Sequence, residues 1–116
     1  MELDSAVHIL SALAHASRLT VFRLLVQAGE AGLPAGEIAR RADILPSTLS
    51  THLGMLTQAG LILARRNGRL IIYTADYERM RELLGYLLED CCAGAPEVCA
   101  PLAEIAARAA CCETAA

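Results

Sequence analysis

The chain has 116 residues and a formal net charge of −3, with 55% hydrophobic but only 3% aromatic residues. This length suits one domain with an aliphatic core, small enough to gain stability from dimerisation. No apolar run approaches the roughly 20 residues needed to cross a bilayer and no signal peptide opens the chain, so we expect a cytoplasmic protein without membrane contact.

Two amphipathic helices are predicted near the N-terminus. The first begins at Asp4 or Ser5, either of which can cap it, and runs to about His15. The second begins at Ser17, and Gly29 stops it. Apolar residues at helical spacing predict the inward faces. These residues are Val7, Leu10, Leu13 and Ala14 in the first helix and Leu19, Phe22, Leu25 and Val26 in the second.

A helix-turn-helix is predicted after a loop at Glu30–Leu33. A short helix at Pro34–Ala42 precedes the four-residue connection Asp43–Pro46, which has the length seen in such motifs. The last residue of this connection, Pro46, also opens the second helix, Pro46–Gln58. Pro46 suits a first helical turn because its missing N–H costs nothing there. Gly60 is expected to end the helix in a left-handed conformation.

The second helix of this motif has two chemically different faces. Leu49, Leu53 and Leu56 recur at i, i+4 and i+7 and form an inward stripe. The opposite face is small and hydroxyl-bearing, so it can lie close to a DNA groove. Its candidate DNA ligands are Ser47, Thr48, Ser50 and Thr51. His52, at the edge of the leucine stripe, is a fifth candidate DNA ligand, as a phosphate contact; the alternative is an edge-packed histidine bonded to the neighbouring helix.

Two strand-like runs, 61–66 and 69–74, flank Asn67-Gly68, which signals a two-residue hairpin turn. Residues 34–75 carry five arginines against two carboxylates, a net charge of +3, whereas residues 76–116 carry −5. This distribution favours DNA binding by the motif, with a solvated charged face as the alternative. The hairpin arginines Arg65, Arg66 and Arg69 are predicted to bind phosphates or the minor groove.

The predicted fold class is therefore mainly α with a small β-hairpin wing: a winged helix-turn-helix that forms a homodimer. A generic α+β packing unit is the alternative. A long helix from Asp76 to about Asp90–Cys92 has a wide apolar stripe, which either contacts a second subunit or only closes the monomer. DNA-binding domains of this size usually bind DNA as two-fold dimers. We expect a DNA-binding and dimerisation domain at 1–92 and a cysteine-rich tail at 93–116.

All five cysteines lie in the last 26 residues, whereas structural cysteines would be spread through the apolar faces. Disulfides are not expected in a cytosolic protein. Cys91, Cys92 and Cys99 can converge as three thiolates without a neighbouring imidazole. Such a set suits As(III) or Sb(III) better than zinc, which takes four ligands in structural sites. Cys111 and Cys112 are a candidate auxiliary pair; a tail that has no function, or only a redox role, is the alternative.

Four segments of the chain carry a family resemblance. They are HASRLTVFRLL (His15–Leu25), EIARRA (Glu37–Ala42), STLSTHLGMLTQAGLI (Ser47–Ile62) and RRNGRLIIYT (Arg65–Thr74). In this order and spacing they resemble the ArsR/SmtB family of metal-sensing repressors, over about residues 5–90. The resemblance implies a homodimer joined through its first and last long helices. It also implies that the helix at Ser47–Gln58 contacts bases, and that inducer binding releases double-stranded operator DNA.

Family sensing sites differ in position. The cysteine pair that one arsenic-sensing branch carries in the first helix of the DNA-binding motif is replaced here by GEIARRA, and Asp76–Asp90 lacks the histidine of a zinc site. Cys91, Cys92 and Cys99 resemble another arsenic-sensing branch, with two adjacent cysteines and a third just past the last helix. Cys111 and Cys112 depart from that pattern.

The predicted function is thus an arsenic(III)-responsive repressor whose release from DNA derepresses a resistance operon, with inorganic or methylated arsenic as inducer. The same fold could instead sense Cd(II), Pb(II), Zn(II) or thiol oxidation. A thiol-dependent reductase is disfavoured because Glu89 and Asp90 adjoin the cysteine pair and oppose an activated thiolate. An interaction module without DNA is disfavoured by the arginines of the hairpin. The chain is not expected to be an enzyme.

Overall fold

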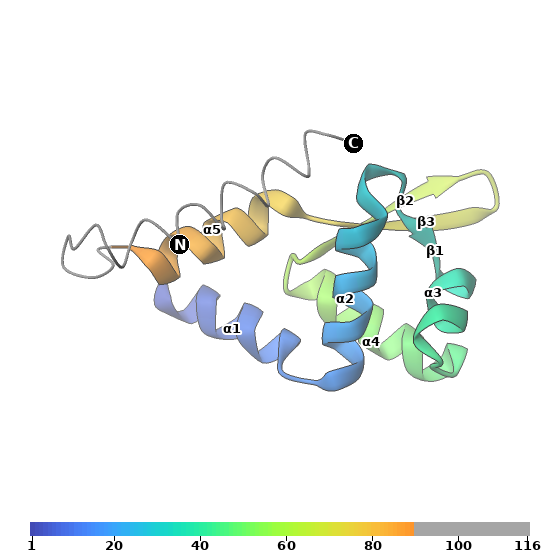
Figure 1. The fold of residues 1–116 in the computed structure, drawn as a ribbon, viewed down its shortest axis with the longest axis horizontal. Helices are drawn as coiled ribbons and strands as arrows, with labels where there is room; N and C mark the ends of the chain where they lie inside the picture. Colours follow the sequence, from blue (N-terminus) through green and yellow to red (C-terminus); the bar gives the residue numbers. More distant parts are fainter. Residues whose placement is uncertain (90–116) are drawn as a thin grey trace.

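The computed structural model describes residues 1–89. Its elements are α1 (Leu3–Leu13), α2 (Ala16–Ala28), the 3-10 helix η1 (Gly29–Ala31), β1 (Leu33–Pro34), α3 (Ala35–Ala42), α4 (Pro46–Gln58), β2 (Ile62–Asn67), β3 (Leu70–Ala75) and α5 (Tyr77–Leu88). In Figure 1, α1 and α5 lie at one end of the molecule and the β2–β3 hairpin projects from the other. The predicted winged helix-turn-helix architecture is confirmed.

The helix-turn-helix forms from α3 and α4, which begins at Pro46 as predicted. Leu49, Leu53 and Leu56 are buried, also as predicted, and they pack in the same core as Ile38 and Ala39 of α3. The connection depends on a feature that the sequence analysis did not identify: Asp43, directly after α3, has a left-handed backbone with φ 55°. This conformation reverses the chain within a few residues, so that α3 and α4 pack on one another.

The end of α4 confirms the predicted role of Gly60, which has φ 78°. The N–H of Gly60 donates to the carbonyl of Thr57 at 3.0 Å, and the N–H of Leu61 donates to that of Leu56 at 3.1 Å. These two bonds make a Schellman motif, in which a left-handed residue satisfies the last carbonyls of a helix. The motif directs the chain from α4 straight into β2.

The sheet has three strands in the order β1-β3-β2, with both pairings antiparallel. The prediction of a loop at Glu30–Leu33 was wrong, because η1 and the start of β1 occupy it; Leu33 pairs with Tyr73. A two-residue strand has no alternating pattern by which to recognise it. The hairpin turn is also shifted by one residue: Asn67 pairs with Leu70, which leaves Gly68 and Arg69 in the turn.

The first helix is rotated relative to the prediction. Val7 and Leu10, expected to face inward, are 52% and 42% exposed, and the buried residues are Ala6, Ile9 and Ala12. The helix also begins at Leu3, without a side-chain cap from the residues proposed for one. Both stripes are apolar at helical spacing, so periodicity alone could not choose between them. Small alanines let α1 pack closely on its neighbours, and the bulkier stripe is left on the surface.

The other two long helices follow the predictions in part. In α2, Phe22 and Leu25 are buried as expected, but Leu19 and Val26 are exposed. In α5, Leu83 is buried and Leu87 is exposed. The predicted start of this helix is confirmed, because a carboxylate oxygen of Asp76 accepts a hydrogen bond from the N–H of Arg79 at 3.2 Å. The predicted end is wrong: the helix stops at Leu88, before the range Asp90–Cys92.

Among residues 1–89, no single helix has both the length and the apolar composition required to cross a membrane. The pair formed by α1 and the segment Ala16–Ala31 meets the criterion by length and composition only, and it is bent by 98°.

Candidate DNA-binding surface

The exposed face of α4, here called the recognition helix, carries the four predicted hydroxyls. Ser47, Thr48, Ser50 and Thr51 are all exposed, on the side opposite the buried leucines. No side chain caps the N-terminus of this helix, where Leu45 is the N-cap residue and is 72% exposed. The first-turn N–H groups and the positive end of the helix dipole therefore have no side-chain acceptor there, which suits a phosphate group.

His52 lies elsewhere. It is only 7% exposed, on the inward side of the recognition helix with Leu49, Leu53 and Leu56. Its ring contacts the ring of His15, with 4.8 Å between centroids. Of the two interpretations in the sequence analysis, the structure matches a packed histidine, although no hydrogen bond to a neighbouring helix is present among residues 1–89.

The three wing arginines have different surroundings. Arg65 donates to the carbonyl of Glu30 and, through its other terminal nitrogen, to that of Ala31, each at 3.1 Å. Neighbouring strand residues point to opposite faces, so Arg66 projects away from Arg65. Arg66 and Arg69, the latter in the hairpin turn, form no hydrogen bond or ion pair with residues 1–89. Two of the three predicted arginines are therefore available to phosphates, and the third fastens the wing to η1.

The outward arginines of α3 are paired within their own helix. Arg40 and Arg41 both bind the carboxylate of Glu37, Arg41 through Nε at 2.8 Å. Hydrogen bonds from Arg40 and then from Arg41 lower the pKa of Glu37, so this carboxylate stays ionised at neutral pH. Half of the charge of this arginine pair is thereby neutralised, and the unpaired positive charge lies mainly on the wing.

The predicted metal ligands Cys91, Cys92, Cys99, Cys111 and Cys112 lie outside the described residues. Within residues 1–89, no group of three or more His, Cys, Asp or Glu side chains is placed to hold a metal ion.

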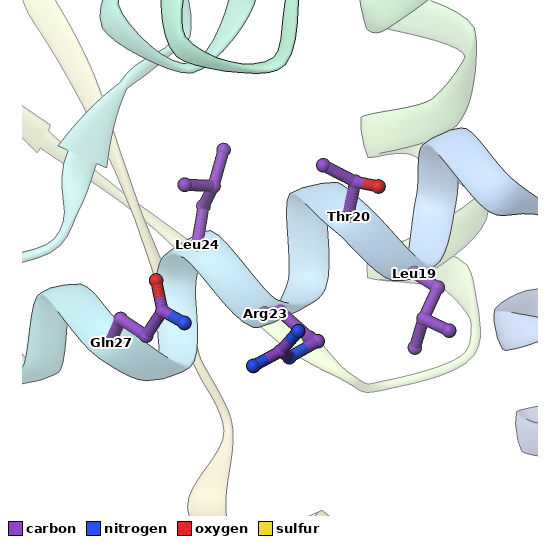
Figure 2. A pocket seen from close by; sticks show the side chains of 5 residues that line it. All are labelled: Leu19, Thr20, Arg23, Leu24 and Gln27. Atoms are coloured by element: carbon purple, nitrogen blue, oxygen red, sulfur yellow. The ribbon is translucent and has the colours of Figure 1, made fainter.

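Several hollows lie on the described surface. Figure 2 shows one of them, lined by Leu19, Thr20, Arg23, Leu24 and Gln27. All five side chains project from α2, where their spacing of i, i+1, i+4, i+5 and i+8 places them on one side of the helix. A surface formed by one side of a single helix does not enclose a small molecule.

Two features of this surface escaped the sequence analysis. Exposure of Leu45 depends on how α3 and α4 pack, and no sequence pattern signals it. The different surroundings of Arg65 and Arg66 had a signal, because consecutive strand residues alternate between the two faces of a sheet. The alternation predicts that the side chains of Arg65 and Arg66 project from opposite faces of the sheet. It does not predict which of the two contacts η1.

Comparison with known proteins agrees with this geometry. Residues 13–65 match the family of helix-turn-helix domains. The chain is 30% identical over 84 residues to the HTH-type transcriptional regulator YgaV of Escherichia coli, covering 72% of this chain and 83% of that protein. It is 39% identical over 67 residues to a Halobacterium salinarum protein named "Putative arsenical resistance operon repressor ArsR", covering 58% of this chain and 51% of that one.

A solved structure gives the same result. The homodimeric winged helix-turn-helix DNA-binding domain Mb0332 of Mycobacterium bovis, described as a possible ArsR-family transcriptional regulator, superposes with a TM-score of 0.61 at 28% identity, over 76% of this chain and 82% of that one. These similar proteins are DNA-binding regulators rather than enzymes. The chain belongs to the ArsR/SmtB family of winged helix-turn-helix transcriptional regulators.

Proposed function

We propose that this transcriptional regulator is a homodimeric repressor that leaves its operator when trivalent arsenic or antimony binds the thiolates of Cys91, Cys92 and Cys99. The observation that carries the proposal is the clustering of all five cysteines directly after the dimerisation and DNA-binding elements. Three soft thiolates suit a thiophilic ion better than a hard one. The name of the Halobacterium relative supports an arsenical signal.

DNA contact is proposed for two surfaces of each subunit. The hydroxyls of the recognition helix lie where the N-terminal residues of such a helix meet base edges and phosphates in the major groove. Arg66 and Arg69 are exposed and have no partner in the described chain, so they can bind phosphates or the adjacent minor groove.

Dimerisation is proposed through α1 and α5. Leu3, Val7 and Leu10 form an exposed apolar stripe on α1, and Leu87 is exposed on α5, which packs against α1. Both helices lie at the end of the molecule away from the wing (Figure 1). A second copy covering this stripe would bury it and set the separation of the two recognition helices, which a two-fold operator requires.

Val7→Arg is expected to dissociate the dimer. Two valine side chains, one per subunit, are removed from the interface at about 1.5–3 kcal/mol each, which corresponds to a dimer dissociation constant raised by about 10²- to 10⁴-fold. Sedimentation equilibrium measures this constant, and circular dichroism confirms that the fold persists. His8→Arg, at an exposed polar position on the same helix, is the matched control. Equal effects of the two substitutions would exclude α1 as the interface.

The cysteines adjoin this proposed interface in sequence, because Cys91 follows the last residue of α5 by three positions. Joining Cys99 to Cys91 and Cys92 through one ion would constrain the chain at the end of α5. That constraint can shift the dimer contact and with it the spacing of the recognition helices. A coupling free energy of about 1–3 kcal/mol lowers operator affinity about 5- to 150-fold.

Fluorescence anisotropy of the full chain on its own upstream DNA tests the proposal. The reductant is a phosphine, because a thiol reductant would compete with the protein for arsenic. Arsenite is expected to weaken binding about 5- to 150-fold in the wild type. It should have no effect on Cys91→Ser, Cys92→Ser or Cys99→Ser, while Cys111→Ser, the matched control, keeps the response.

Three outcomes would contradict this mechanism. If arsenite released Cys99→Ser from the operator as effectively as it releases the wild type, the site would consist of only two thiolates, as expected for a methylated arsenical. Release only by Cd(II), Pb(II) or Zn(II) would leave a repressor with a different inducer. Release by oxidation alone, reversed by the reductant, would make the cysteines a redox sensor.

A further inference from the structure

Two histidines join the recognition helix to the junction between α1 and α2. His15 is the N-cap residue of α2, and its Nδ1 accepts a hydrogen bond from the N–H of Ser17 at 3.1 Å. His52 comes from the middle of α4 and packs on His15 with 4.8 Å between ring centroids and 47° between ring planes. His52 therefore belongs to the inward side of α4, whereas the hydroxyls proposed to meet DNA are on its exposed side.

The two rings differ in how their nitrogens are satisfied. Because Nδ1 of His15 accepts, a neutral His15 ring carries its proton on Nε2. Nδ1 of His52 is buried and has no hydrogen-bond partner among residues 1–89. A buried polar group without a hydrogen-bond partner destabilises the fold, so a leucine would be the more stabilising residue at this point of the stripe. A histidine at this position of the apolar stripe thus calls for an explanation other than stability.

The surroundings of His52 oppose a positive charge. Arg18 of α2 donates through Nε to the carbonyl of Ala12 at 2.6 Å and through a terminal nitrogen to the sulfur of Met55 at 3.4 Å, which places its charge beside α4. Burial lowers the pKa of His52 most, and His15 and Arg18 lower it further. Neither ring has an ion-pair partner within the described chain.

Other charged groups on the packed elements do not compensate. On α3, Glu37 is held by Arg40 and Arg41 on the exposed side. The arginines of β2 lie on the wing, and His8 of α1 is exposed. Protonation would therefore place a charge on His52, in a buried position and beside the charge of Arg18.

We propose that His52 is a positioning residue, and that its contact with His15 makes operator binding sensitive to protons. The recognition helix keeps its DNA-binding position while the buried ring of His52 is neutral, and acidification charges this ring and displaces the helix. This inference rests on the proposed use of α4 to contact DNA. It assigns to the chain an acid response that is independent of the cysteines.

The direction of the effect follows from linkage. The pKa of His52 in the folded chain is below its ordinary value of 6.5, so below that pH the unfolded or displaced state binds more protons than the packed state does. The packed arrangement is fully favoured above pH 6.5 and loses free energy as the pH falls towards the lowered pKa. Operator affinity should weaken over the same range.

The test is operator affinity between pH 8 and pH 5, measured by anisotropy on the full chain without metal. Between pH 7.5 and 5.5, wild-type affinity is expected to fall relative to that of His52→Leu, which has no ring to titrate at this position, by up to about tenfold per subunit. His15→Asn keeps an acceptor for the Ser17 N–H and removes the ring that contacts His52, so the fall in affinity should be smaller than in the wild type. His8→Gln, an exposed histidine, is the control that keeps the wild-type profile.

A second measurement covers the case in which His52→Leu fails to fold. NMR titration of the wild-type imidazole Cε1–H signals should show one ring titrating below pH 6.5, with its shift following the loss of DNA binding. Identical pH profiles for wild type, His15→Asn and His8→Gln, or a His52 ring that titrates without any change in affinity, would overturn the inference. Absence of operator binding at pH 8 would overturn the proposed function along with it.

Discussion

Gly32→Ala is expected to lower the free energy of unfolding by about 2–6 kcal/mol, a large share of the roughly 5–15 kcal/mol that stabilises a domain. Gly32 has φ 66° and ψ −170°, a conformation that only glycine adopts readily. A Cβ there would overlap the carbonyl oxygen of Tyr73 and lie 2.7 Å from Cγ2 of Thr74 and 2.8 Å from Cγ2 of Ile72. One of these contacts is with the backbone of β3, which cannot move aside without breaking the sheet.

Gly29→Ala is the matched control for this prediction. Gly29 has nearly the same backbone, φ 70° and ψ −155°, but nothing lies within 4 Å of its Cβ position. The control should therefore lose only the backbone contribution, about 1–3 kcal/mol. Urea unfolding of both variants at one protein concentration measures the difference, which isolates the overlap with β3. Equal losses would mean that η1 and β1 move away from β3 at little cost.

Arg66→Ala/Arg69→Ala is expected to weaken operator binding by about 10²- to 10³-fold near 0.15 M salt, since four phosphate ligands are lost from a dimer. The slope of log affinity against log salt should become shallower by about 3–4, because each neutralised phosphate contributes about 0.9. These side chains have no partner in the described chain, so the fold should be unaffected.

Arg65→Ala distinguishes a phosphate ligand from a structural arginine on the same strand. Its guanidinium donates to the carbonyls of Glu30 and Ala31, so its removal should leave the salt slope unchanged. Any loss of affinity would come from a wing no longer fastened to η1. Anisotropy titrations at several salt concentrations measure both quantities. If Arg65→Ala made the slope of log affinity against log salt as much shallower as the loss of Arg66 or of Arg69 does, all three arginines would bind phosphates.

Predictions from the sequence succeeded where the determining chemistry is local. Pro46 began α4, Gly60 ended it, Asp76 capped α5 and the leucine stripe of α4 was buried as expected. Each of these depends on backbone preferences and side-chain spacing within a few residues. Errors of one residue, as at the turn of Gly68 and Arg69, occur because neighbouring residues offer nearly equivalent turns.

The proposals of a cysteine site and of an arsenic response rest on the sequence alone, because they depend on the spacing of the cysteines and on the softness of thiolate ligands. The proposed acid response could not be inferred in this way. His52 was placed at the edge of a stripe, but its burial and its contact with His15 depend on how α4 packs against the α1–α2 junction. A side chain's environment comes from elements distant in sequence, which periodicity does not report.

Local sequence thus determined which segments are helices and strands, where most of them begin and end, and which residue types face outward on α4. Only the tertiary structure decided which of the two apolar stripes of α1 is buried, that Leu33 pairs with β3, and that Arg65 contacts η1 while Arg66 does not. The reason is physical: hydrogen bonding and capping act over a few residues, whereas burial is a property of the assembled chain.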